Sequence, residues 1–174
     1  MDADENAVSG PRTFSPGPDS VEVGVAAICV ARHPARLMTP ALGSCVGVAL
    51  WDPGVRLGAL GHVMLPCPGD GTPGHSAKYA EWAVPEMVRQ LVDQGATRRR
   101  IQAKIAGGAA MFARESSVPS IGERNVEEVK RQLESLQITL LAEDTGQAHA
   151  RTVELALDTG ILFVHSHRFG TREL

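Results

Sequence analysis

The stretch that decides the fold is residues 42–50, LGSCVGVAL, followed at residues 61–63 by GHV. A Gly-Ser pair precedes Cys45, and an apolar run that alternates with small residues follows it. This pattern predicts a turn that places Cys45 at the start of a buried strand. Gly43 and Gly47 leave room for another backbone or a substrate to come close to the sulfur.

A second apolar run, residues 59–65, carries one polar interruption, His62. If the two runs pair as neighbouring strands, the Cys45 thiol and the His62 imidazole meet at the same end of a sheet. A cysteine and a histidine are the minimum apparatus for thiol nucleophilic catalysis. Core packing is the alternative interpretation of both residues, because buried cysteines and hydrogen-bonded core histidines are common.

Length and composition predict one globular domain with a proper core. The chain has 174 residues, of which 43% are hydrophobic and 21% charged, values ordinary for such a domain. The net charge is −3, and residues 98–100 (RRR) are the one notable basic cluster, so a nucleic-acid role has little support.

Targeting signals and cysteine usage point to the cytoplasm. No apolar run approaches the roughly 18 residues that a bilayer span needs, and the acidic N-terminus does not have the layout of a signal peptide. The three cysteines, Cys29, Cys45 and Cys67, are an odd number without framework spacing. We therefore expect reduced thiols and a cytoplasmic protein.

The order of expected elements predicts an α+β domain with mixed sheets. Residues 1–19 are expected to be a disordered extension, residues 20–165 the domain and residues 166–174 a C-terminal tail. One strand should run from Val21 past Cys29, and a loop should lead from His33-Pro34 to Thr39, which the following proline holds extended. Further strands are expected at 46–51, 59–65, 101–106, 138–142, 153–157 and 161–164.

Two helices complete the expected elements. One is capped by Ser76, is kinked or divided at Pro85 and ends at Gly95. The other begins at Asn125, with Glu128 in the reciprocal capping position. Because strands and helices do not alternate regularly, a doubly wound parallel sheet is disfavoured.

Two other kinds of site compete with the thiol site. The tripeptide Asp-Thr-Gly occurs at 144–146 and 158–160, as around aspartic-protease carboxylates, but it is also good turn chemistry, which we favour. A zinc site would have to use side chains without the paired short spacing of structural zinc sites. The candidates are His62, Cys67, His75, His165 and His167.

Several blocks of sequence resemble the CheD family of chemoreceptor glutamine deamidases. The first blocks are Thr39 with residues 42–48, and residues 61–66 (GHVMLP). The later blocks are 78–80 (KYA), 104–109 (KIAGGA), 121–125 (IGERN) and 142–146 (AEDTG). Together they span about residues 21–160 in the expected order, which is more specific than any one motif.

The resemblance implies hydrolysis of selected glutamine side-chain amides in the cytoplasmic helices of methyl-accepting chemotaxis receptors. It implies a triad-like site at Thr39, Cys45 and His62 that needs no cofactor, and a CheC-type phosphatase as a possible partner. Related folds include bacterial toxins that deamidate glutamine. The expected fold is therefore an α+β sandwich of mixed β-sheets with flanking helices, like those of cysteine hydrolases.

The chemistry of these residue types fits a thioester mechanism. Only a few per cent of a free thiol is ionised at neutral pH. We therefore expect His62 to take the Cys45 proton, so that an ion pair keeps the sulfur nucleophilic, and Thr39 to orient the ring. The glycine-bearing turn, Gly43-Ser44, makes the N–H groups of Ser44 or Cys45 candidates for the oxyanion site.

A rival of another class is a chemotaxis adaptor that binds receptors or a CheC-type phosphatase and whose catalysis is incidental. An intact set of Thr39, Cys45 and His62 favours the enzyme, because an adaptor has no physical reason to keep a nucleophile.

Overall fold

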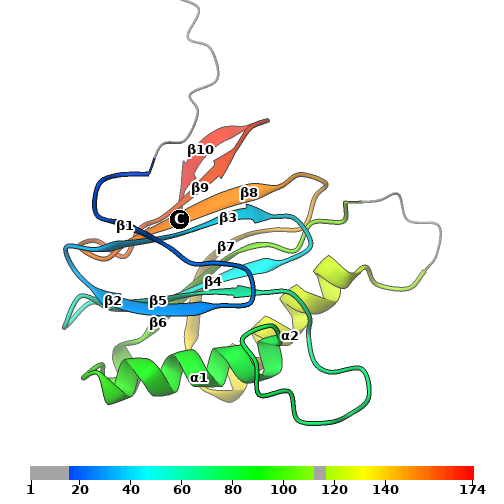
Figure 1. Ribbon diagram of the computed structural model, residues 1–174, viewed down its shortest axis with the longest axis horizontal. Helices are drawn as coiled ribbons and strands as arrows, with labels where there is room; N and C mark the ends of the chain where they lie inside the picture. The colour runs from blue at the N-terminus through cyan, green and yellow to red at the C-terminus, as the bar shows by residue number, and fades with distance from the viewer. Residues whose placement is uncertain (1–15, 112–116) are drawn as a thin grey trace, which may run out of the picture.

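Two five-stranded sheets and two helices form three layers (Figure 1). The computed structural model describes residues 16–111 and 117–174. The outer sheet has the order β1 (Ser20–Glu22), β3 (Arg36–Leu42), β8 (Arg151–Ala156), β9 (Leu162–Ser166), β10 (Gly170–Glu173). The central sheet has the order β2 (Ile28–Arg32), β5 (Leu57–Val63), β4 (Val46–Asp52), β6 (Gln102–Gly107), β7 (Thr139–Thr145). The expected α+β sandwich is confirmed.

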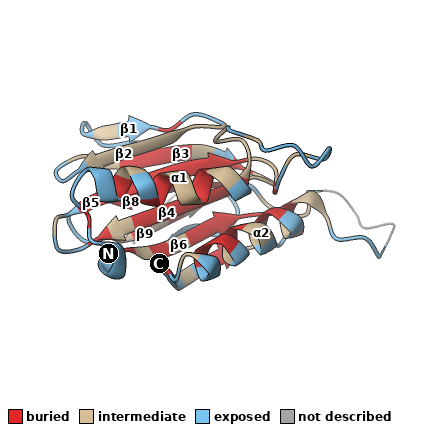
Figure 2. Ribbon diagram, turned by 90° about the horizontal axis from the view of Figure 1, so that it is seen from below, coloured by how far each residue is buried: buried red, intermediate tan, exposed pale blue. Residues whose placement is uncertain are grey.

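Both sheets are mixed. Strand β1 pairs in parallel with β3, and β6 pairs in parallel with β7, whereas the other neighbours are antiparallel. Helices α1 (Ala80–Asp93) and α2 (Ile121–Ser135) cover the face of the central sheet that points away from the outer sheet, with their buried sides inward (Figure 2). A 3₁₀ turn, η1 (Arg98–Arg100), precedes β6.

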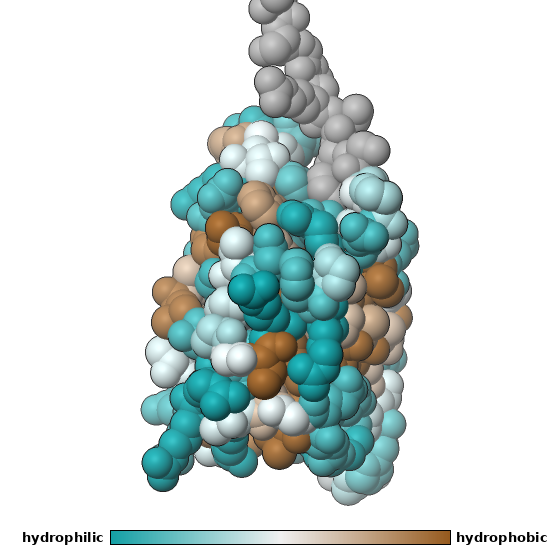
Figure 3. All heavy atoms as spheres, turned by 90° about the vertical axis from the view of Figure 1, so that its left-hand side faces the viewer, coloured by the Kyte–Doolittle hydropathy of each residue, from teal (hydrophilic) through white to brown (hydrophobic). Residues whose placement is uncertain are grey.

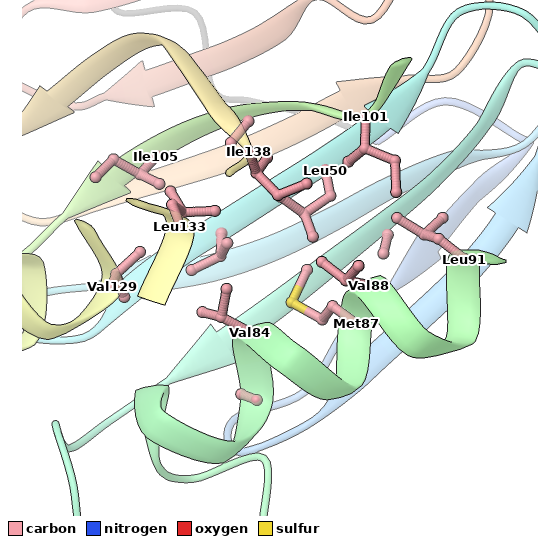
Figure 4. Close-up of a cluster of buried hydrophobic side chains, with 14 of the residues drawn as sticks. Leu50, Val84, Met87, Val88, Leu91, Ile101, Ile105, Val129, Leu133 and Ile138 are labelled. Carbon is pink, nitrogen blue, oxygen red and sulfur yellow. The ribbon is translucent and has the colours of Figure 1, made fainter. Parts of the chain in front are cut away.

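The near-continuous apolar sequence of β4 follows from its place in the middle of the central sheet. Val46, Val48 and Leu50 point into the core under the helices, part of which is drawn in Figure 4. Ala49 and Trp51 alternate with them and point into the second core, between the two sheets. Both faces of this strand are therefore covered, as the sequence predicted.

On one face of the molecule hydrophilic residues predominate, with separate hydrophobic patches among them (Figure 3). In the part of the chain that the structure describes, no helix is long and apolar enough to cross a membrane.

Two expected elements near the N-terminus, a strand and a loop, are wrong in their boundaries. The strand expected from Val21 past Cys29 is two strands in different sheets, because a turn that contains Ala26 at φ 57° separates β1 from β2. The loop expected between His33 and Thr39 is short, since β3 already begins at Arg36 and includes Thr39 in extended conformation.

Both helices begin at other residues than expected. Helix α2 begins at Ile121, where Ser120 accepts a hydrogen bond from the Glu123 N–H and Glu123 bonds back to the Ser120 N–H, so the capping box lies five residues earlier. Helix α1 begins at Ala80 and continues through Pro85 as one helix.

The two chain ends differ in what the structure describes. Residues 1–15 of the expected N-terminal extension lie outside the described residues. Residues 166–174, predicted as a tail, include β10, which pairs with β9 in antiparallel register.

Candidate active site

Cys45 lies in a turn between β3 of the outer sheet and β4 of the central sheet, and it is half-buried. Three consecutive carbonyl groups of this turn accept hydrogen bonds from elsewhere in the chain. The bonds are Ala109 N to Gly43 O (2.8 Å), Asn125 Nδ2 to Ser44 O (2.9 Å) and Gly108 N to Cys45 O (2.8 Å). The backbone around the thiol is therefore fixed from one side.

Gly107 allows β6 to approach this turn. Its φ is +112°, and a Cβ at this position would lie 2.2 Å from the Cys45 carbonyl oxygen. No real Cβ atom comes so close to a backbone oxygen. Only glycine can occupy this position without moving the turn that carries Cys45.

His62 is the penultimate residue of β5 and is 1% exposed. Its backbone is held on the edge side by the segment before β2, through His62 N to Ala27 O (3.0 Å) and Ala26 N to His62 O (3.1 Å). Its Nδ1 atom lies 2.7 Å from the hydroxyl of Thr39, a fully buried residue of β3. The imidazole and the hydroxyl thus meet across the two sheets.

The hydrogen bonds of Thr39 assign the tautomer of His62. The Thr39 hydroxyl donates its one proton to the Val23 carbonyl oxygen at 2.7 Å. It must then accept from His62, so Nδ1 carries the ring proton and Nε2 carries a lone pair. This Nε2 is buried and has no hydrogen-bond partner among the residues that the structure describes.

The strand register brings Cys45 to the same end and the same face. Gly47 of β4 lies opposite His62 of β5. Cys45 precedes Gly47 by two positions, so it is a diagonal neighbour of His62, and it packs at the edge of the core between the sheets. A Cβ at Gly47 would lie 2.8 Å from Leu42 Cδ1, so a larger residue here would force the Leu42 side chain to move.

Burial keeps both reactive groups neutral in this structure. It raises the pKa of the Cys45 thiol and lowers the pKa of the His62 imidazole. These directions disfavour the ion pair expected from the sequence. They favour a neutral thiol beside a neutral imidazole that can take its proton.

The other sequence candidates lie apart from this group or have ordinary roles. Asp144 forms an ion pair with buried Arg151, and Gly146 and Gly160, which follow the two Asp-Thr dipeptides, both have positive φ, as the turn interpretation predicts. Cys67 is exposed. Among the described residues, no group of three or more His, Cys, Asp and Glu side chains could hold a metal ion.

Two contacts of the site were not predicted from the sequence: the Val23 carbonyl, and the Asn125 amide behind the Cys45 turn. A backbone acceptor leaves no mark in the sequence. Asn125 stood in one of the quoted blocks, but its assignment as a helix start concealed its role.

A buried imidazole with a free nitrogen, oriented by a hydroxyl and placed at the same end of a sheet as a thiol, is the arrangement typical of cysteine hydrolases. The α+β sandwich supplies these groups from both of its sheets. Comparison with known proteins then defines the family.

The family model described as CheD chemotactic sensory transduction matches residues 64–166. The chemoreceptor glutamine deamidase CheD of Thermotoga maritima is 47% identical over 82% of this chain and 88% of its own length. Probable chemoreceptor glutamine deamidases of Lachnoclostridium phytofermentans and Moorella thermoacetica are each 43% identical, over 85% and 86% of this chain and 94% and 92% of their own. This chain belongs to the CheD family.

Among solved structures, the hypothetical protein YfiH of Bacillus licheniformis matches 70% of this chain and 51% of its own, with 15% identity and a TM-score of 0.48. So low a similarity supports no conclusion about this chain.

Proposed function

We propose that this protein hydrolyses the side-chain amides of specific glutamine residues in methyl-accepting chemotaxis receptors, giving glutamate and ammonia. The names of its CheD relatives support the reaction class and the receptor substrate. The observation that carries the mechanism is the 2.7 Å contact between Thr39 and His62, because it leaves the buried Nε2 as a base.

In the first half of the reaction His62 Nε2 takes the thiol proton as Cys45 Sγ attacks the Cδ carbon of glutamine. The resulting tetrahedral intermediate expels the amide nitrogen, which takes the proton from His62 and leaves as ammonia. A thioester between Cys45 and the substrate remains. His62 then takes a proton from water as the hydroxide attacks the thioester. The second tetrahedral intermediate expels the Cys45 sulfur, which takes this proton back from His62, and glutamate leaves.

The oxyanion of each tetrahedral intermediate needs hydrogen-bond donors. We assign this role to the N–H groups of Ser44 and Cys45, which have no hydrogen bond to another residue in the described part of the chain. The carbonyl groups of the same turn are occupied, so its N–H groups keep a fixed direction. Gly43 belongs to the same turn, and its carbonyl group accepts a hydrogen bond from Ala109 N.

The receptor partner follows from the same proposal, and so does a cytoplasmic location, where the modified receptor helices lie. A CheC-type phosphatase as a second partner rests on the family resemblance alone. If the test of deamidation described below fails, the rival hypothesis applies, in which the protein is a chemotaxis adaptor whose catalysis is incidental.

Mass spectrometry of a receptor cytoplasmic fragment tests the proposal directly. Deamidation replaces NH₂ with OH and adds about one dalton per site, which peptide mapping locates. We expect a gain with wild type, no gain with Cys45→Ala, and a normal gain with Cys67→Ala, which removes an exposed thiol outside the site. Receptor binding without any mass gain would support an adaptor instead.

A further inference from the structure

The buried amide of Asn125 joins the two strand ends that carry the reactive groups. Asn125 lies in α2 and is 0% exposed. Its Nδ2 donates to Ser44 O at 2.9 Å, immediately before Cys45, and to Met64 O at 2.8 Å, two residues after His62. One side chain from the helix layer therefore holds the nucleophile turn and the end of β5 together.

These contacts determine the orientation of the amide. Both neighbours are carbonyl oxygens, so the nitrogen must face them, because the reverse orientation would place three oxygens together. The other end, Oδ1, is buried and finds no hydrogen-bond partner in the described part of the chain. An unsatisfied buried acceptor costs stability. The two bonds donated by Nδ2 are therefore what this buried amide contributes at the site.

Peptide geometry connects this hydrogen bond to the reaction. The carbonyl of Ser44 and the N–H of Cys45 belong to one planar trans peptide and point in opposite directions. The bond from Asn125 pulls this carbonyl toward α2. It thereby aims the Cys45 N–H away from α2, on the side of its own thiol group.

We infer that Asn125 is a positioning residue that aims the Cys45 N–H at the oxyanion and keeps the Cys45 turn in place relative to the His62 strand. The inference rests on the proposed amide hydrolysis and adds a residue outside Thr39, Cys45 and His62. Asn125 does not touch the reacting atoms. Its effect passes through the Ser44–Cys45 peptide.

Two reactions of the same thiol separate this role from general support of the fold. Amide hydrolysis passes through an oxyanion, whereas alkylation of Cys45 by iodoacetamide does not. The first variant is Asn125→Leu, which keeps the size of the side chain and adds no charge. The second is Asn125→Ala, and the matched control is Gln132→Leu, which removes another largely buried amide of α2 that bonds to Glu128 instead.

For both Asn125 variants we expect kcat for receptor deamidation to fall about 10- to 100-fold, with KM nearly unchanged. The pH profile and rate of Cys45 alkylation, mapped by peptide mass, should stay within about twofold of wild type, since no oxyanion forms. Gln132→Leu should keep wild-type kcat. Circular dichroism and thermal melting verify that each variant is folded.

Several outcomes would overturn the inference. One is an Asn125 variant with wild-type kcat, and another is a loss of Cys45 alkylation in parallel with kcat. A third is failure of both Asn125 variants to fold, which would make Asn125 a residue needed for stability. An inactive wild-type protein would instead refute the proposed function itself, so the two failures are distinguishable.

Discussion

The hydroxyl of Thr39 has a single proton, and the destination of that proton determines how His62 can act. Because the proton goes to Val23 O, the hydroxyl offers its lone pair to Nδ1, and the free lone pair of the imidazole is on Nε2. A serine hydrolase uses a carboxylate for this purpose. Here the neutral hydroxyl of Thr39 orients the ring, and a neutral partner suits a buried imidazole that is itself neutral.

Replacement of Thr39 by valine tests the orienting hydroxyl. Thr39→Val keeps the branched shape and removes the acceptor for His62 Nδ1–H, so the ring can adopt the wrong tautomer. We expect kcat to fall at least about tenfold, since proton transfer by a positioned group contributes 10²- to 10⁴-fold. Thr39→Ser keeps the hydroxyl and should retain most of the activity. Equal deamidation rates for Thr39→Val and the wild-type protein would exclude an orienting role of the Thr39 hydroxyl.

The neutral resting state predicts a characteristic pH dependence. Burial lowers the pKa of His62 from its ordinary 6.5, so the base remains unprotonated somewhat below that pH. The acid limb of kcat/KM should then have its midpoint below 6.5. Burial raises the pKa of Cys45 from its ordinary 9.0, so alkylation by iodoacetamide should rise with a midpoint above 9.0. An alkylation midpoint near neutrality would indicate an ion pair instead.

The sequence could single out the three candidate catalytic side chains but not the contacts that support them. Cys45 and His62 interrupt apolar runs, and Thr39 precedes a proline that keeps it extended, so each leaves a visible signal. Their assigned roles remain predictions until the variants are measured. Asn125 leaves no comparable signal, because its function depends on which two carbonyl groups α2 approaches in three dimensions.

At the scale of elements, the end of β6 and the turn before β4 form one unit. Gly107 and Gly108 both have positive φ, and Gly108 N bonds to the Cys45 carbonyl. The sequence predicted a tight turn at this glycine pair. It could not predict that the turn would support the nucleophile, since that contact links residues more than sixty positions apart.

A methyl group at Gly107 should displace the nucleophile. Gly107→Ala places a Cβ 2.2 Å from Cys45 O, in addition to the cost of positive φ, which is about 1 kcal/mol. We expect deamidation to fall more than tenfold and the free energy of unfolding to fall by about 2 kcal/mol or more. The matched control is Gly170→Ala, with φ +72° and no atom within 4 Å.

For Gly170→Ala, the free energy of unfolding measured with urea should fall only by the cost of positive φ. Its deamidation activity should stay at the wild-type level. Equal losses in the two variants would mean that the approach to Cys45 does not matter.

The errors in element boundaries have local causes. Alternating apolar residues continue from Val21 through Cys29, so the pattern does not reveal the left-handed turn at Ala26 that moves the chain from one sheet to the other. At α2, Asn125 and Glu128 fit the capping box as well as Ser120 and Glu123 do. The earlier pair is used, and the additional turn of helix places Gly122 and Asn125 among the buried residues of α2.

At the scale of the whole molecule, polar bonds tie the two sheets together around their shared apolar layer. Besides Thr39 and His62, Trp51 Nε1 of β4 donates to Leu157 O after β8 at 3.1 Å. Asp144 of β7 pairs with Arg151 of β8 at 2.8 Å, with side chains 6% and 0% exposed. Both partners of this ion pair are buried, as are Thr39 and His62.

Removal of Asp144 should destabilise the entire domain. Asp144→Ala leaves the Arg151 guanidinium buried without its counter-charge, and breaking such a pair costs about 3–5 kcal/mol. Glu86→Ala, which breaks the surface pair with Arg89 (side chain 59% exposed), should cost at most about 1 kcal/mol. Urea unfolding measures the free energy of unfolding of Asp144→Ala and Glu86→Ala for this comparison. Similar losses would show that the inter-sheet ion pair contributes no more than a surface pair.

The hydrogen bond between Thr39 and His62 crosses from one sheet to the other, and this has a consequence for how the protein tolerates change. Neither sheet of the sandwich contains both Thr39 and His62, two of the proposed catalytic residues. A slight slip of the halves would separate donor from acceptor while each half kept its own strand pairing. The deamidation rate therefore depends on the exact position of one sheet relative to the other. A substitution far from the Cys45 thiol can abolish activity without unfolding the protein.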